Sequence, residues 1–145
     1  MTPKQRAEKS AKAMLTLDNA SQWLGFRLVS VDEGQAEFAL SVAEHHVNGH
    51  GICHGGITFA LADTAFAFAC NSRNQATLAM HNVISYIAPG RLGDTLTARA
   101  CEVTLNGRNG IYDVKITNQD NQLIAEFRGM SRAIRGTNFD EGKDT

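Results

Sequence analysis

The chain has 145 residues, of which 43% are hydrophobic, and its 14 Lys and Arg residues nearly balance its 15 Asp and Glu residues, for a formal net charge of −1. This length suits one domain with a substantial core. The near-neutral charge gives no indication of a nucleic-acid or membrane-surface partner, and Asp63 interrupts the longest apolar stretch before it reaches membrane length.

The N-terminal part of the chain is predicted to form a helix and two strands. An amphipathic helix is expected from about Pro3 to Leu17, with a short second turn over Ser21–Leu24. Phe26–Val31 suits a strand, and Gln35–Val42 alternates between apolar and polar residues. The apolar face of this second strand carries Ala36, Phe38, Leu40 and Val42. This alternation predicts a half-buried antiparallel strand.

A long apolar segment from Gly55 to Cys70 follows a loop rich in His and Gly. It lacks Pro and is rich in Ala, which favours a helix, and it is apolar nearly all round, which indicates a buried one. Its one charged residue is Asp63. An unpaired buried carboxylate is costly and tends to have a raised pKa or a function. Gly55 and Gly56 leave the N–H groups at the helix start open to a ligand. An acid and exposed amides are the parts of an acyl-transfer or hydrolysis site.

Four strands are expected in the rest of the chain, and the last two turns between them look like hairpins. The strands are about Thr77–Ile87, Thr95–Thr104, Gly110–Thr117 and Gln122–Ile134. This order predicts an α+β fold in which one long antiparallel β-sheet wraps around a long central helix. We expect a single domain over residues 1–135, with the helix of residues 3–17 at its start, and a flexible polar tail over residues 136–145.

Several motifs in this order resemble those of the hotdog-fold acyl-CoA thioesterases. They are His54-Gly55-Gly56, Leu61-Ala62-Asp63, the run from Ile84 to Pro89, and Gly93-Asp94. The resemblance covers about Leu24 to Ile134. The run from Leu61 to Ser72, the hairpin around Gly107 with Tyr112-Asp113, and the closing Phe127-Arg128-Gly129 are similar to the branch of the family that acts in phenylacetate degradation.

The resemblance implies a hotdog fold and a role for four residues. Asp63 would be the general base or the nucleophile, and the Gly55 amide would polarise the thioester carbonyl. Asn48 would lie near the reacting water or the carboxylate, and His54 would be a supporting residue. Some relatives place a Ser or Thr early in the strand after the helix. The nearest positions here are Ala79, Met80 and His81, so the chain departs from that pattern.

The spacing of Gly55 and Asp63 indicates a homodimer. The two residues are eight positions apart, which is roughly 12 Å along one helix axis at about 1.5 Å per residue. Each must come within about 3 Å of the same carbonyl group, so one helix cannot easily supply both. A second copy of the helix, antiparallel across a two-fold axis, would supply the missing group. The resemblance also implies active sites at a dimer interface and pairing of dimers into a tetramer.

Other polar residues allow weaker hypotheses. His46, His50 and His54 are four residues apart, but Gly49 and Gly51 disfavour a helix there, so we expect no metal site. A thiol nucleophile at Cys53 is disfavoured because neighbours in sequence rarely have the required geometry. Gly56 is a further candidate for substrate binding. Arg91 and Arg108 lie on expected loops and are candidates for binding the phosphates of coenzyme A, although loop arginines are more often simply solvated.

These observations predict an acyl-CoA thioesterase that uses water as its second substrate and needs no cofactor. Coenzyme A would be part of the substrate, and the resemblance to the phenylacetate branch implies that the acyl group is phenylacetyl or hydroxyphenylacetyl. Another aromatic or medium-chain acyl-CoA is the first alternative, and a non-hydrolytic acyl-CoA binder or a dehydratase using His54 is the second. The three scattered cysteines and the charged N-terminus favour the cytoplasm.

Overall fold

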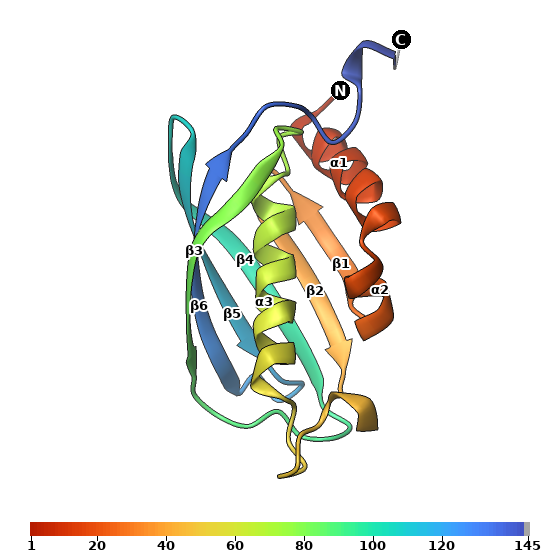
Figure 1. The fold of residues 1–145 in the computed structure, drawn as a ribbon, viewed down its shortest axis with the longest axis vertical. Helices are drawn as coiled ribbons and strands as arrows, with labels where there is room; N and C mark the ends of the chain where they lie inside the picture. The colour runs from red at the N-terminus through yellow and green to blue at the C-terminus, as the bar shows by residue number, and fades with distance from the viewer. Residues whose placement is uncertain (144–145) are drawn as a thin grey trace.

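The computed structural model describes residues 1–143 as a six-stranded antiparallel sheet wrapped around one long helix (Figure 1). The sheet order is β1-β2-β4-β5-β6-β3. The helices are α1 (Pro3–Leu17), α2 (Asn19–Leu24) and α3 (Gly55–Cys70), with short 3-10 turns at Glu44–His46 and Glu141–Lys143. The strands are β1 (Arg27–Asp32), β2 (Gln35–Ser41), β3 (Thr77–Tyr86), β4 (Thr95–Asn106), β5 (Asn109–Thr117) and β6 (Leu123–Ala133). The predicted α+β arrangement is therefore confirmed, and the predicted strand ends lie within two residues of the observed ones.

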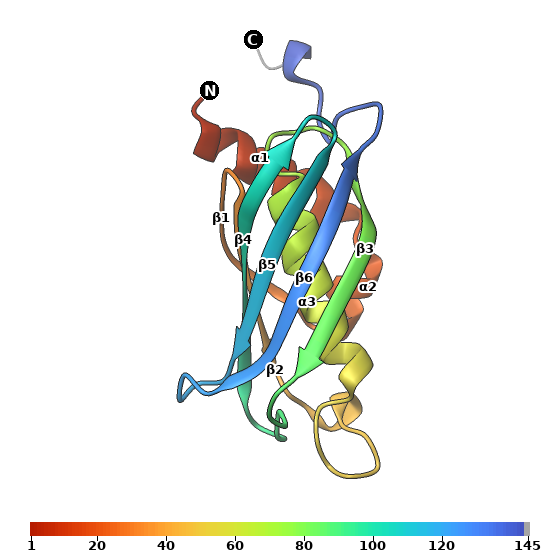
Figure 2. The same cartoon turned by 90° about the vertical axis from the view of Figure 1, so that its left-hand side faces the viewer.

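Helix α3 is the centre of the core, as its all-round apolar character predicts. Leu61, Ala62 and Phe66 are fully buried, and the many alanines of the helix allow it to pack closely against the sheet. The views in Figures 1 and 2 show α3 running along the inner face of the curved sheet. The predicted inward face is buried beneath it and comprises Ala36, Phe38 and Leu40 of β2 and Val42 just after it. Ala39 on the other face is buried as well, so the alternation is not strict.

The N-terminal helices lie beside β1, at one edge of the sheet (Figure 1). Thr2 caps α1 by accepting a hydrogen bond from the Gln5 N–H at 3.1 Å, and the Gln5 side chain accepts one from the Thr2 N–H. Beyond β6, Asn138 donates to Ser10 of α1 at 2.8 Å. The flexibility expected for residues 136–145 stays a prediction, and residues 144 and 145 lie outside the described residues.

Strand β3 forms the opposite edge of the sheet. Within residues 1–143 it pairs with β6 alone, and Figure 2 shows its other side open. Large apolar side chains along and just after it are more than half exposed; they are Leu78, Met80, Val83, Tyr86 and Ile87. An open strand edge with a row of apolar side chains favours pairing with another chain.

Gly129 of β6 offers a test of how tightly this core packs. A Cβ atom at this position would lie 2.8 Å from the ring of Phe66, and that ring is fully buried between Tyr112 and Phe127. We expect Gly129→Ala to lower the free energy of unfolding by about 1–3 kcal/mol, because the ring has no room to move. Urea unfolding measures this, with the exposed Thr104→Ala on β4 as the control. An unchanged midpoint for Gly129→Ala would show that the core repacks freely.

Candidate active site

Helix α3 begins at Gly55 and is capped by the residue before it. The Nδ1 atom of His54 accepts a hydrogen bond from the Gly56 N–H at 2.9 Å, and the His54 carbonyl oxygen accepts from the N–H groups of Ile57 and Thr58. In the part of the chain that the structure describes, the Gly55 N–H has no acceptor. The first turn of α3 therefore keeps one backbone donor for a ligand, at the positive end of the helix dipole. The Gly56 N–H, by contrast, is already engaged by His54.

Tyr86, the last residue of β3, contacts the start of α3. Its hydroxyl donates to the Gly55 carbonyl oxygen at 2.8 Å. A Cβ atom at position 55 would lie 3.3 Å from the Tyr86 ring and hydroxyl, so the close approach of the ring explains why a glycine begins the helix. Because the sequence shows Tyr86 only as one residue of an apolar run, no local signal identified it as part of the site.

A groove lies beside this end of α3. Its lining includes Asn48, Gly55, Thr58 and Tyr86, so two of the predicted site residues share it. The Asn48 side chain is fixed by its own loop, because its Oδ1 atom accepts hydrogen bonds from the N–H groups of His50 at 2.9 Å and Ile52 at 3.4 Å. Asn48 and Gly55 thus line the same groove, so an amide side chain and a backbone N–H are both available to a ligand there.

Asp63 lies two turns further along α3, half-buried between the helix and β3. Its Oδ1 atom accepts a hydrogen bond from the side-chain Nδ2 of Asn82 at 3.1 Å. Burial raises the pKa of the Asp63 carboxyl above its ordinary value, and the hydrogen bond from Asn82 opposes that rise. A carboxyl with a raised pKa is a suitable general base near neutral pH.

Asn82 was missed because β3 is irregular. The pairing of β3 with β6 shifts between Ala79 and His81, so Met80 is bulged. A bulge changes which side chains face inward. The three positions nearest to the Ser or Thr of some relatives are all exposed here: Ala79, Met80 and His81. After the bulge, Asn82 faces the helix. A polar residue among the apolar ones of an edge strand was the available signal, but the sequence does not show the bulge that turns it inward.

The candidate residues therefore form two clusters on one helix. Asn48, Gly55 and Tyr86 surround its start, and Asp63 with Asn82 lies eight residues further on, roughly 12 Å along the axis. Strand β3 runs antiparallel to α3 and contacts both clusters. Its two contacting residues are four positions apart, which spans about 13 Å in a strand and matches the distance along the helix.

The two candidate arginines lie at opposite ends of the molecule. Arg91 is exposed, and its backbone forms an isolated antiparallel β-bridge with Ile52, which lines the groove. Arg108 lies in the hairpin between β4 and β5 and donates to the Ala133 carbonyl oxygen, near the end of α3 that is remote from Gly55. Since α3 has 16 residues, about 24 Å of helix separates the two ends. Within one chain the two arginines are therefore too far apart to bind the neighbouring phosphates of one coenzyme A together.

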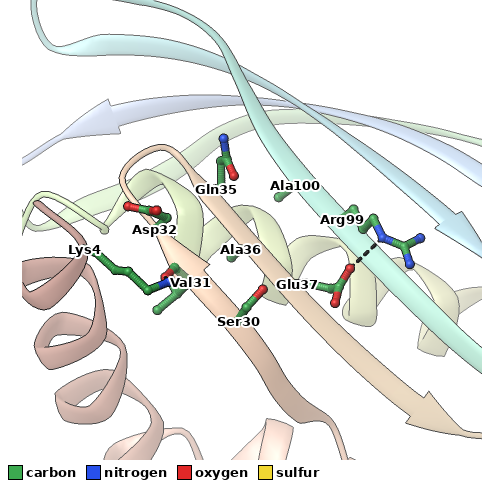
Figure 3. A pocket seen from close by; sticks show the side chains of 9 residues that line it. All are labelled: Lys4, Ser30, Val31, Asp32, Gln35, Ala36, Glu37, Arg99 and Ala100. Carbon is green, nitrogen blue, oxygen red and sulfur yellow. Dashed lines mark hydrogen bonds and ion pairs between the residues drawn. The ribbon is translucent and has the colours of Figure 1, made fainter.

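A second hollow lies between α1 and the strands β1, β2 and β4 (Figure 3). The charged residues lining it are largely paired, since Arg99 forms an ion pair with Glu37 at 2.6 Å and the Lys4 ammonium contacts the Val31 carbonyl oxygen at 3.5 Å. It contains none of the predicted site residues. The groove at Gly55 is therefore the better candidate for the active site.

Comparisons with known proteins also point to a thioester-hydrolysing site. Residues 50–125 match the model of the thioesterase superfamily. The acyl-coenzyme A thioesterase PaaI of Escherichia coli strain K12 is 44% identical over 132 residues, which cover 91% of this chain and 94% of that protein. The solved structure of the E. coli PaaI protein from the phenylacetic acid degradation operon superposes with a TM-score of 0.92 at 43% identity, over 94% of this chain and 99% of that one. The Streptococcus mutans protein smu.793, solved bound to acetyl CoA, is 28% identical with a TM-score of 0.73, over 77% of this chain and 90% of that one.

Proposed function

The chain belongs to the thioesterase superfamily and is an acyl-CoA thioesterase of the hotdog fold, and we propose that its substrate is an aromatic acyl-CoA, phenylacetyl-CoA or hydroxyphenylacetyl-CoA. The proposal is supported by the similarity to E. coli PaaI over nearly the whole length of both chains. The observation that carries the hydrolytic activity is the half-buried Asp63 carboxylate on the same helix as the Gly55 N–H, which has no acceptor among the described residues.

The chemistry needs an activated water and a place for negative charge. As general base, Asp63 takes a proton from a water molecule whose oxygen bonds to the thioester carbonyl carbon. The Gly55 N–H donates to the carbonyl oxygen as it becomes negative, aided by the helix dipole. The carbon–sulfur bond then breaks, and the CoA thiolate leaves with the free acid as the other product. Alternatively, the Asp63 carboxylate attacks the carbon itself and the carbon–sulfur bond breaks, so that the CoA thiolate leaves and a mixed anhydride forms. Water then hydrolyses this anhydride to the free acid and the Asp63 carboxylate.

Both groups reach one carbonyl when two chains associate. In a homodimer with a two-fold axis beside β3, the two α3 helices run antiparallel, and Gly55 of one chain approaches Asp63 of the other. The roughly 12 Å between the two residues on one helix supports this arrangement, as does the open apolar edge of β3. We further propose that dimers pair into a tetramer, for which the exposed Val103 and Leu105 of β4 offer additional apolar surface.

The same dimer accounts for the two arginines as candidates for the CoA phosphates. Arg91 lies beside Gly55 of its own chain, and the antiparallel arrangement brings Arg108 of the second chain toward that end. Coenzyme A as the carrier is supported by the relative that was solved with acetyl CoA. The three cysteines are free thiols, which suits a reducing compartment such as the cytoplasm. No helix among the described residues is long and apolar enough to span a membrane.

The test is a thiol-release assay across a panel of acyl-CoA substrates, run with and without a strong chelator. We expect the highest kcat/KM for phenylacetyl-CoA or hydroxyphenylacetyl-CoA, and no change with the chelator, because Asp63 and the Gly55 N–H supply the chemistry. A preference for medium-chain or benzoyl-type substrates would overturn the acyl assignment. Retention of acyl-CoA without release would indicate a binder, and hydration of a crotonyl-type substrate would indicate a dehydratase. Loss of activity that one specific divalent ion restores would indicate a metal site.

A further inference from the structure

Asn82 is the one side chain of β3 that contacts the Asp63 carboxylate through a hydrogen bond. We propose that Asn82 is a positioning residue, which holds the Asp63 carboxylate in one orientation and favours its ionised form. This inference rests on the proposed role of Asp63 in hydrolysis. The chain has no Ser or Thr at the nearby positions where some relatives place one, and Asn82 is brought to Asp63 by the bulge at Met80.

The amide is oriented by the charge of its partner. Its Nδ2 atom lies 3.1 Å from Asp63 Oδ1 and donates to it. The reversed orientation would place the Asn82 carbonyl oxygen against an ionised carboxylate, so that two acceptors would face each other. The donated N–H therefore favours the ionised carboxylate.

The free-energy cost of burying the Asn82 carbonyl oxygen also indicates a function. The Oδ1 atom of Asn82 is buried, and no donor within the described residues contacts it. A buried acceptor without a partner costs about 1–3 kcal/mol, whereas an apolar side chain of similar shape would avoid that cost. Stability alone therefore does not explain an asparagine here, and groups that carry such a cost are typical of functional sites.

Other titratable groups that face α3 stay neutral or paired near neutral pH. Burial raises the pKa of the Cys70 thiol to about 12, and burial also raises the pKa of the Tyr112 hydroxyl. Tyr112 donates to Glu102, which is paired with Arg73. Burial and the Asn82 hydrogen bond are thus the two influences on the pKa of Asp63. Removing Asn82 leaves burial unopposed, so the pKa of Asp63 rises and the base is lost at a higher pH.

The first experiment measures kcat/KM against pH for Asn82→Ala, with Asn82→Leu as a similar-volume alternative if the Ala variant does not fold. Below the midpoint of the acid limb we expect a loss of roughly 10- to 100-fold, the scale of a hydrogen bond to a charged group. The midpoint itself should move to higher pH, and the loss should shrink on the alkaline plateau. Asn82→Ser, which keeps a donor, should recover part of the loss. Ser85→Ala, exposed on the same strand, should match the wild type.

The second experiment needs no substrate. The carboxyl carbon of Asp63 is followed by ¹³C NMR against pH in the wild type and in Asn82→Ala, with Asp63→Asn to assign the signal. A higher titration point in the variant supports the proposal. An unchanged titration point, or a loss of kcat/KM that is uniform across pH, would show that Asn82 only supports the fold. If the wild type releases thiol from no acyl-CoA, the proposed function fails, while the NMR titration still decides the role of Asn82.

Discussion

Replacing Asp63 with Ala is expected to lower the rate of thiol release by about 10²–10⁴, which is the scale for loss of a general base, and by more if Asp63 is the nucleophile. The reason is chemical. Asp63 is the only charged residue of α3, and its carboxylate is the group that we propose activates water. The measurement is kcat with the best substrate of the acyl-CoA panel, on protein whose folding and oligomeric state have been checked.

Asp63→Asn separates the loss of the base from a change in packing. It keeps the volume of the side chain and should be nearly as inactive as Asp63→Ala, with an oligomeric state like that of the wild type. Asp120→Ala, in the exposed turn between β5 and β6, is the matched control and should retain full activity. Thiol release close to the wild-type rate from folded Asp63→Ala would remove Asp63 from the mechanism.

Two inactive variants are expected to restore activity when they are combined. The first chain carries Asp63→Ala, and the second carries Gly55→Val, whose side chain would meet the Tyr86 ring that already lies 3.3 Å from a Cβ atom at that position. In a two-fold dimer each site takes position 55 from one chain and position 63 from the other. A mixed dimer therefore contains one doubly damaged site and one intact site. Random mixing makes about half of the dimers mixed, so up to about one quarter of the wild-type activity should return.

Co-expression of the two differently tagged chains and a thiol-release assay on the unfractionated mixture make this measurement. Tandem purification then isolates the mixed dimers, which should have up to about half of the wild-type activity because one of their two sites is intact. Mixing Asp63→Ala with itself is the control and should restore nothing. If mixed dimers are isolated and remain inactive, the shared site is wrong, and Gly55 and Asp63 must act within one chain.

The features of the site that the sequence predicted are those encoded locally. The apolar run from Gly55 to Cys70 predicted a buried helix, and the single charge within it identified Asp63. The glycine pair identified the start of that helix. The alternation of β2 predicted its buried inward face, although Ala39 on the other face is buried as well. In each case the information lay within one element, either as a repeating pattern of apolar residues or as the few residues that interrupt an apolar run.

The features that sequence reasoning missed depend on contacts between elements. Asn82 faces Asp63 only because the bulge at Met80 changes the inward face of β3, and a bulge of this kind leaves no clear mark in the residues themselves. Tyr86 reaches Gly55 because β3 runs back along α3. The spacing of Gly55 and Asp63 predicts a second chain, but one chain alone shows neither its position nor its contacts.

The match between the two spacings along α3 and β3 restricts how this part of the chain can change length. Since successive strand side chains point to opposite faces, an insertion or deletion between Asn82 and Tyr86 would leave only one of them directed at the helix. Substitutions at the three positions between them do not face this limit. Natural variation in this stretch should therefore be in residue type and not in residue number, so the spacing of Asn82 and Tyr86 would be inherited as a fixed length.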